Sequence, residues 1–236
     1  MLPNFNDLID TATLPYARAG QYAYQFARGK LRYDPVFHAV LKDGLLPNQG
    51  RLLDLGCGLG VLPALLNQAR SQYQAGNWFA DWPTPPQHLE LLGVELLQWK
   101  VTAATQALED KATIRQGDIR TIELPQCSGI VILDVLLYLN AAEQQQILQR
   151  IAQALQPGGV LLLCEGNAAG GLRFHITRLA EQICCLSRGQ GWQPLHYRST
   201  KEWMALLQEL GFSVESLPMS QGTPFANVLF RATRVA

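Results

Sequence analysis

Short, nearly continuous apolar runs recur from residue 51 onward, and stretches with apolar residues at helical spacing separate them. Uninterrupted apolar runs are typical of parallel strands buried on both faces, and the intervening periodicity predicts amphipathic helices. The predicted strands are 52–55, 89–95, 112–115, 129–133, 160–165, 213–217 and 227–233. The predicted helices of this region are 61–70, 98–109, 142–155, 172–186 and 200–210. This alternation predicts an α/β fold with a mostly parallel sheet and helices on both faces.

Three segments depart from the alternation. Residues 1–47 show helical periodicity interrupted by prolines, and we expect an N-terminal helical cap there. Residues 73–88 contain two tryptophans and three prolines, which favours an ordered surface loop inserted after the first helix. Residues 166–200 combine glycine-rich loops with one helix, and we expect a lid-like insertion. The predicted division is therefore a cap at 1–47 and a main domain at 48–236.

The segment 51–60 reads Arg-Leu-Leu-Asp-Leu-Gly-Cys-Gly-Leu-Gly and leads into the helical pattern at 61. A strand, a glycine turn and a helix N-terminus together form a place where a polar or anionic ligand meets free N–H groups. The spacing is not that of the nicotinamide fingerprint, because position 61 is Val and the next acidic strand end, Glu95, lies too far along the chain. A phosphate-binding P-loop also requires a Gly-Lys-Ser/Thr sequence, which is absent here.

The sequence Leu-Asp-Leu-Gly-Cys-Gly-Leu-Gly at 53–60 resembles the first motif of class I S-adenosylmethionine-dependent methyltransferases. Three later segments of the chain follow in the order of that family's motifs. The resemblance covers residues 50–165 well and the C-terminal strands more loosely. It implies a Rossmann-like methyltransferase fold with seven strands, mostly parallel, and an antiparallel strand at the C-terminal edge. It also implies an enzyme with S-adenosylmethionine as its cofactor.

The resemblance assigns roles residue by residue. The glycine loop would lie against the amino-acid part of the cofactor, with Asp54 orienting the loop or the cofactor ammonium. Glu95 would accept hydrogen bonds from the ribose hydroxyls, Asp118 and Ile119 would hold adenine, and Asp134 would end the fourth strand at the methyl-transfer cleft. The implied cofactor site is Asp54, Gly56, Cys57, Gly58, Gly60, Glu95, Leu96, Asp118, Ile119 and Asp134.

Each carboxylate also has a purely structural interpretation. Asp54 could cap the turn, Glu95 could cap the helix that follows it, and Asp118 could form an Asx-turn. Arg28, Lys30 and Arg32 are candidates for an anionic group of the cofactor or substrate, or else they form a solvated helix face.

The amino-acid composition argues against several classes of binding partner. The chain has 236 residues with 19 basic and 19 acidic side chains and no basic block, which argues against a nucleic-acid partner. There is no apolar run long enough for a membrane span and no signal-peptide pattern, so we expect no membrane partner. The five cysteines form no metal-binding spacing, and we expect reduced thiols in the cytoplasm and no metal. A homodimer stays open.

The expected acceptor is a small molecule, because Asp134-Val-Leu-Leu-Tyr138 lacks the motif of methylases that act on amino groups of DNA or protein glutamine. The N-terminal phrase at 26–37 also resembles methyltransferases of bacterial aryl-polyene pigment clusters, which implies an aromatic or carrier-bound hydroxyl. Such an acceptor commonly needs a general base. The candidates are His175, His196, Tyr197 and Tyr138, with His175 first and His196 second. Each histidine could instead be a surface or structural residue. The alternatives are a protein or RNA methyltransferase and a non-catalytic binding subunit with this fold.

Overall fold

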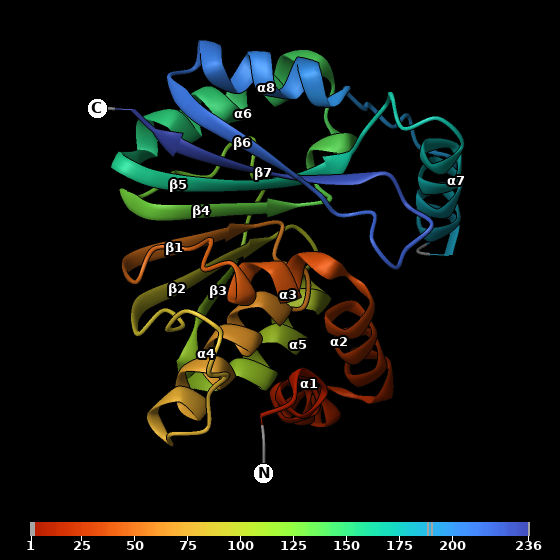
Figure 1. Ribbon diagram of the computed structural model, residues 1–236. Coiled ribbons are helices and arrows are strands. Elements are labelled where there is room, and N and C mark those ends of the chain that lie inside the picture. The colour runs from red at the N-terminus through yellow and green to blue at the C-terminus, as the bar shows by residue number, and fades with distance from the viewer. Residues whose placement is uncertain (1–2, 188, 190, 236) are drawn as a thin grey trace.

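Seven strands form one mixed sheet in the computed structural model, which describes residues 3–187, 189 and 191–235. The order of the strands across the sheet is β3-β2-β1-β4-β5-β7-β6, so the chain crosses over between β3 and β4 (Figure 1). The strands are β1 (Gln49–Leu55), β2 (His88–Glu95), β3 (Thr113–Gln116), β4 (Cys127–Leu133), β5 (Leu155–Gly166), β6 (Phe212–Pro218) and β7 (Asn227–Arg234). All seven predicted strands are confirmed.

The strands β1 to β5 run parallel, and β7 is antiparallel to both of its neighbours, β5 and β6. The predicted antiparallel hairpin at the C-terminal edge is therefore confirmed, with β6 as the outermost strand. Because the carboxyl ends of parallel strands meet at one edge of the sheet, the residues after β1, β2 and β4 are brought together there.

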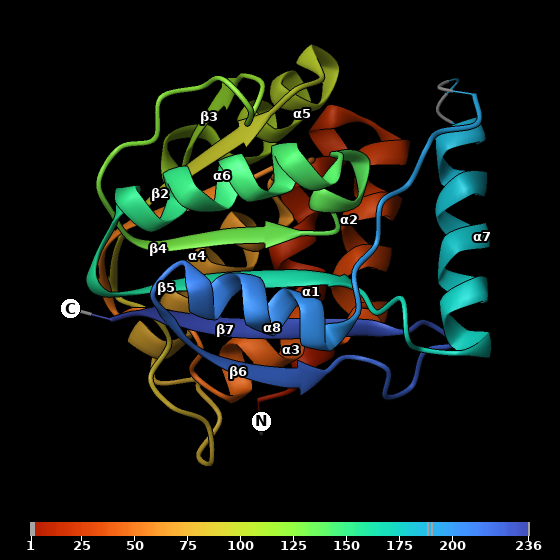
Figure 2. The same cartoon turned by 90° about the horizontal axis from the view of Figure 1, so that it is seen from above.

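Helices cover both faces of the sheet. They are α1 (Phe5–Thr13), α2 (Gln21–Tyr33), α3 (Pro35–Lys42), α4 (Val61–Gln74), α5 (Gln98–Leu108), α6 (Ala141–Ala154), α7 (Leu172–Ser187) and α8 (Thr200–Glu209). Short 3₁₀ helices are η1 (Leu14–Ala19), η2 (Glu109–Lys111) and η3 (Leu136–Tyr138). The helices α1 to α5 lie on one face, and α6 and α8 lie on the other (Figure 2).

Alternation along each strand divides the core into two layers. Leu52 faces the core formed with α1 to α5, whereas the next residue, Leu53, faces the core formed with α6 and α8. Successive strand side chains point to opposite faces, so a strand covered by helices on both sides must be apolar at every position. This explains the uninterrupted apolar runs of the sequence.

The helix starts follow ordinary capping chemistry. Asn140 and Ser199 each form a capping box with the glutamate three residues later, at the starts of α6 and α8. The α4 helix, like α2 and α5, has no side-chain cap, and its flanking residue Gly60 is in a left-handed conformation. Its first N–H groups are thus left to other partners.

The helix α7 stands apart from the two helical layers, at the edge of the sheet where β4 and β5 end (Figures 1 and 2). The segment 73–88 forms an aromatic cluster in which Phe79 and Trp82 stack and Trp82 meets His38 edge-on. Within the described part of the chain, no helix is both long enough and apolar enough to cross a bilayer.

Candidate active site

The glycine turn after β1 is shaped by three left-handed glycines. Gly56, Gly58 and Gly60 have φ values of 76°, 59° and 70°. A Cβ added to Gly56 would lie 2.4 Å from Val135 Cγ2, and one added to Gly60 would lie 2.7 Å from Leu108 Cδ1. A Cβ added to Gly58 meets no heavy atom within 4 Å. Packing against the branched Val135 side chain therefore requires a glycine at position 56, and the positive φ favours one at position 60. Gly58 borders open space that a ligand can occupy.

Glu95 connects the end of β2 to the glycine turn. Its Oε2 accepts a hydrogen bond from the Gly58 N–H at 3.1 Å, and its Oε1 accepts one from the Leu97 N–H at 2.9 Å. The Lys100 ammonium lies 3.8 Å from Oε1. The residue is only 6% exposed, and its neighbour Leu96 is 57% exposed. Each carboxylate oxygen retains capacity for a further donor, so the structural role and a ligand contact are compatible.

Asp54 is buried at the end of β1, directly before the glycine turn. Burial raises its pKa from 3.8 to about 7, and the nearby charge of Glu95 acts in the same direction. Burial also raises the pKa of the Cys57 thiol, which packs within the turn. This end of β1 is therefore a place where added positive charge would be stabilised.

Tyr16, in η1, fixes the glycine turn from the N-terminal side. Its hydroxyl donates to the carbonyl oxygens of Leu59 and Gly60, at 2.8 and 2.9 Å. The side chain is fully buried, and burial raises the pKa of the phenol. The sequence pattern did not identify this residue, because the contact joins positions more than forty residues apart.

The predicted adenine segment has a well-defined local structure. Asp118 accepts hydrogen bonds from the backbone N–H and from the guanidinium of Arg120, which together form an Asx-turn closed by an ion pair. Arg120 holds the pKa of Asp118 below its ordinary value. Ile119 is buried beside this turn. Adenine recognition by the Asp118 carboxylate would have to share or displace the Arg120 contacts.

Asp134 follows β4 in a left-handed conformation, with φ 57°. Lys30 Nζ lies 2.9 Å from its Oδ2 and 2.8 Å from Oδ2 of Asp34, and Asn227 Nδ2 donates to its Oδ1 at 3.3 Å. The two carboxylates raise the pKa of Lys30 despite its burial. Lys30 is therefore already neutralised by two acids and ties α2 to the end of β4.

The other two candidate cations of the N-terminal helices, Arg28 and Arg32, also have hydrogen-bond partners. Arg28 donates to Asp10 at 2.7 Å, and Arg32 donates to Asn6 at 3.3 Å. Arg28 and Lys30 are thus paired with carboxylates, whereas Arg32 contacts only a neutral amide oxygen. A role of these cations toward an anionic ligand stays a prediction.

Glu165 ends β5 and is a buried carboxylate that the motif analysis did not assign. Its Oε1 accepts from the N–H groups of Val135 and Leu136, at 3.2 and 2.7 Å, so it shapes the backbone after β4. Burial raises its pKa well above the ordinary value, and the Asp134 charge adds to this effect. Tyr197 lies close by, with a buried hydroxyl that has no hydrogen-bond partner among the described residues. The sequence did contain a signal for this residue, because Glu165 is an acidic residue at the end of a predicted strand, as Glu95 is.

His175 lies within α7, and His196 lies in the segment that follows this helix. His175 is exposed in the first turn of α7, and its ring contacts Phe174. The side chain of His196 is also exposed, but its backbone is anchored, since its N–H donates to the Leu137 carbonyl at 2.8 Å. Both histidines therefore follow β5, on the segment that α7 belongs to.

The structure places the strand-end residues in two groups at the carboxyl edge of the parallel strands. Contacts join Glu95 to the glycine turn, and charge interactions join Asp54 to Glu95 and Asp134 to Glu165. Asp118 lies after β3, which pairs with β2 next to Glu95. The roles of these residues toward the cofactor stay predictions.

Comparison with known families gives one match over most of the chain. A sequence profile described as a methyltransferase domain matches residues 23–217. That range begins within α2, includes every strand from β1 to β5, and ends within β6. It therefore contains all of the predicted cofactor residues.

Curated relatives match a smaller part of the chain. Carboxy-S-adenosyl-L-methionine synthase of Enterobacter sp. (strain 638) is 32% identical over 115 residues, which cover 49% of this chain and 43% of the relative. The protein of the same name from Psychrobacter arcticus is 31% identical over 147 residues, covering 60% of this chain and 50% of the relative. The chain thus spans about half the length of these relatives.

A solved structure of similar fold is the magnesium protoporphyrin IX methyltransferase of Synechocystis with bound S-adenosylhomocysteine. It aligns with a TM-score of 0.60 at 18% identity, covering 98% of this chain and 97% of that one. The open space at Gly58 and the remaining acceptor capacity of Glu95 fit a cofactor with a methionine portion and ribose hydroxyls. From the profile match and this geometry, the chain belongs to the methyltransferase domain family of class I, S-adenosylmethionine-dependent enzymes.

Proposed function

We propose that this protein transfers the methyl group of S-adenosylmethionine to a hydroxyl of a small-molecule acceptor, either aromatic or carrier-bound. The observation that carries the proposal is the Glu95 carboxylate, which is fixed to the Gly58 N–H beside open space at the end of β1. The cofactor supplies an electrophilic methyl group on a positively charged sulfur. The chain has to bind it, orient the acceptor and exclude water.

A small acceptor is supported by the surface and by the cavities. The formal net charge is zero, so the chain has no excess of positive charge for RNA. A cavity of about 270 Å³ lies between α7 and the β6–β7 hairpin, and this volume is compatible with a small molecule. The related fold in Synechocystis belongs to a protein whose name gives a small-molecule acceptor, which is consistent with this proposal.

Two segments are proposed to enclose the acceptor. They are the N-terminal cap at 1–47, set apart from the main domain at 48–236, and the lid-like insertion at 166–200. Lys30 and Tyr16 tie the cap to Asp134 and to the glycine turn, so the cap is positioned at the end of the sheet where transfer would take place. Closing such segments over a site removes water from the reacting groups.

The direct test is methyl transfer from S-adenosylmethionine carrying an isotope-labelled methyl group. Purified protein is incubated with small aromatic alcohols and phenols, and in parallel with protein and RNA from a cell extract. Label in a small hydroxyl compound, together with formation of S-adenosylhomocysteine, is the expected result. Label found only in protein or RNA would contradict the small-molecule acceptor, and no turnover with any acceptor would support the non-catalytic alternative.

A second candidate function is synthesis of carboxy-S-adenosyl-L-methionine. It is favoured by the curated relatives of that name, which share about 30% identity with this chain. Mass spectrometry of the nucleoside products separates the two candidates. Methyl transfer leaves S-adenosylhomocysteine, whereas the alternative would leave a carboxylated form of S-adenosylmethionine.

A further inference from the structure

An apolar stripe runs along the outward face of α7. It consists of five large aliphatic side chains, each between 38% and 76% exposed, namely Leu172, Ile176, Leu179, Ile183 and Leu186. Single exposed leucines are ordinary on protein surfaces, whereas a continuous apolar patch on one element marks an interaction site. The helix stands apart from the two helical layers, so the stripe is open to a partner (Figures 1 and 2).

The spacing of the stripe is that of a coiled-coil seam. Successive residues are separated by four, three, four and three positions, which is a repeat of seven. Ile176 and Ile183 occupy one position of this heptad, called a, and the three leucines occupy the other, called d. Isoleucine at a with leucine at d is the combination that favours two parallel strands in coiled coils. The stripe therefore has the pattern of one half of a parallel helix pair.

The opposite face of α7 is held by the rest of the chain. Thr177 Oγ1 accepts a hydrogen bond from the Ala226 N–H at 2.9 Å, and Glu181 accepts one from the Tyr138 hydroxyl. Cys185, one turn farther along this face, is fully buried. An isolated helix of this length would be marginal in water, but α7 is ordered by these contacts before any partner arrives. Pairing would therefore cost little conformational entropy of the backbone.

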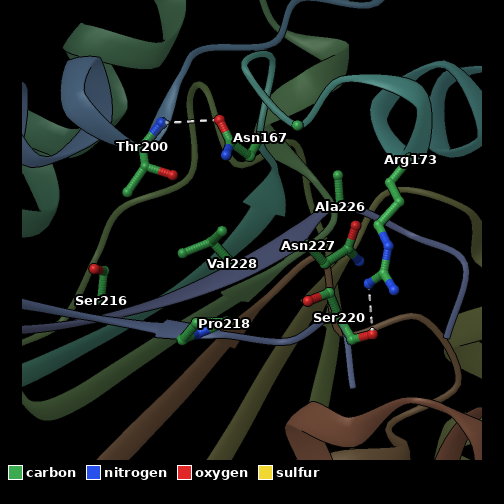
Figure 3. A pocket seen from close by; sticks show the side chains of 10 residues that line it. Asn167, Arg173, Thr200, Ser216, Pro218, Ser220, Ala226, Asn227 and Val228 are labelled. Atoms are coloured by element: carbon green, nitrogen blue, oxygen red, sulfur yellow. Dashed lines mark hydrogen bonds between the residues drawn. The ribbon is translucent and has the colours of Figure 1, made fainter. Parts of the chain in front are cut away.

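The residues that flank the stripe do not oppose pairing between two copies. In the same heptad, the flanking positions e and g are occupied by Arg173, His175, Ala180, Gln182 and Ser187. Arg173 turns back to the β6–β7 loop, where its Nη1 donates to the Ser220 carbonyl at 2.9 Å (Figure 3). In a parallel pair, each g residue meets the e residue five positions farther along the other helix, so no two like charges meet across this seam. The flanks also carry no acidic or basic series that would select a charged partner helix.

The area of the stripe sets the expected strength of the contact. A helix of 16 residues is about 24 Å long and about 10 Å wide, so two copies of α7 offer a combined footprint of about 500 Å². Stable interfaces bury at least about 1,200 Å² of accessible surface. The area therefore fits a reversible dimer with micromolar affinity and not a permanent one.

We propose that the α7 stripe binds a second copy of this chain, as a parallel, two-fold symmetric helix pair in register. A two-fold pair needs only one patch, because both copies use the same surface. The pair would cover all five stripe residues and would join the lid-like insertions at 166–200 of the two copies. This inference is independent of the methyl-transfer function proposed above.

Sedimentation of the full-length protein over a series of concentrations tests this assignment. The native chain is expected to pass from monomer to dimer as its concentration rises. Leu179→Glu places a charge at the centre of the seam and should weaken the dimer by about tenfold or more. Leu14→Glu is the matched control, because Leu14 lies in η1 and is exposed to a similar extent, at 60% against 58% for Leu179. Circular dichroism shows whether both variants keep their helices.

A mixture of two variants tests whether the stripe pairs with itself. Leu179→Glu and Leu179→Lys should each be monomeric, and the two proteins in equal amounts should form a dimer, because Leu179 faces the partner's Leu179 in the parallel pair. A native chain that stays monomeric, a dimer unaffected by Leu179→Glu, or a mixture that stays monomeric would overturn the assignment. Native protein that sediments as a monomer but binds phosphatidylglycerol vesicles through Leu179 would overturn it in favour of a membrane surface. Formation of S-adenosylhomocysteine is measured separately, so these outcomes leave the proposed function untouched.

Discussion

The backbone N–H of Gly58 donates to Oε2 of Glu95 at 3.1 Å and so fastens the turn after β1 to the end of β2. Gly58 is the one glycine of the turn whose added Cβ would meet no described heavy atom within 4 Å. The same carboxylate therefore holds the glycine turn in place and lies beside the space where a cofactor fits. Loss of Glu95 should affect both the turn and the ligand.

Replacing Glu95 with Ala should weaken S-adenosylmethionine binding by about 2 kcal/mol, because it removes a charged acceptor for the ribose hydroxyls. Calorimetry on the purified variant measures the change. Glu90→Ala is the control, since Glu90 lies on the same strand but is exposed and pairs with Arg51. Unchanged affinity in a folded Glu95→Ala protein would contradict the ribose assignment.

Gly58→Val should abolish cofactor binding while the secondary structure is largely kept. A Cβ there meets no heavy atom within 4 Å, and we expect the valine side chain to fill the space that the methionine portion needs. Gly76→Val is the matched control, because Gly76 has a similar φ of 71°, equally open surroundings and no place in the site. Equal cofactor affinity in the two variants would mean that the ligand lies elsewhere.

The raised pKa of Asp54 predicts that the stability of the fold depends on pH. This pKa is raised from 3.8 to about 7 in the folded chain, so between these values the folded state holds a proton that the unfolded chain has released. The contribution of this group to stability is therefore present at low pH and lost as pH rises toward 7. An asparagine at position 54 does not titrate, so the Asp54→Asn variant lacks this pH-dependent loss of stability. The free energy of unfolding of the variant minus that of the native protein should therefore increase with pH, on the order of 1 kcal/mol per pH unit.

Denaturation in urea at several pH values measures this difference. Asp81→Asn, on the exposed loop, controls for the removal of one negative charge. A difference between Asp54→Asn and the native protein that stays constant from pH 4.5 to 7.5 would contradict the raised pKa of Asp54.

Lys30→Met should destabilise the protein by about 1–3 kcal/mol, because Asp34 and Asp134 would then face each other without a cation. The side chain of Lys30 is 31% exposed, so the loss stays below that of a fully buried pair. Denaturation midpoints of Lys30→Met and of Lys42→Met, an exposed lysine at the end of α3, test this. Equal midpoints would show that the Lys30 network adds nothing to stability.

Much of the fold was predictable because the central strands β1, β4 and β5 contain nearly continuous apolar runs and the helices keep their own period. The strand ends followed from the same pattern, and this placed Glu95 and Asp134 at one edge of the sheet. The motif at 53–60 then predicted that the turn after β1 binds the cofactor. These are local features, written in consecutive residues.

The remainder depends on contacts between distant segments. Tyr16 is placed by the carbonyls of Leu59 and Gly60, and Asn227 is placed by the pairing of β7 with β5. No sequence motif next to Tyr16 or Asn227 indicates that either residue lies at the site. Lys30 looked available from sequence alone, because the two acids that neutralise it include one more than a hundred residues away.

The general base is the last prediction. If the acceptor is a hydroxyl, His175→Ala should lower turnover by ~10²–10⁴ with cofactor affinity unchanged, and His196→Ala is the second candidate. Imidazole is suited to take a proton near neutral pH, and both histidines follow β5 in the chain, His175 in the first turn of α7 and His196 after that helix. His88→Ala is the control, since His88 is exposed at the opposite end of β2. Normal turnover in both variants would remove the acid–base role, so that positioning and exclusion of water carry the reaction, or the acceptor arrives already ionised. The assignment of the cofactor site would be unaffected by that result, because the hydrogen bonds of the two histidines in the described part of the chain, apart from those within α7, go to Gly171, Leu137 and Gln144, which are not predicted cofactor residues.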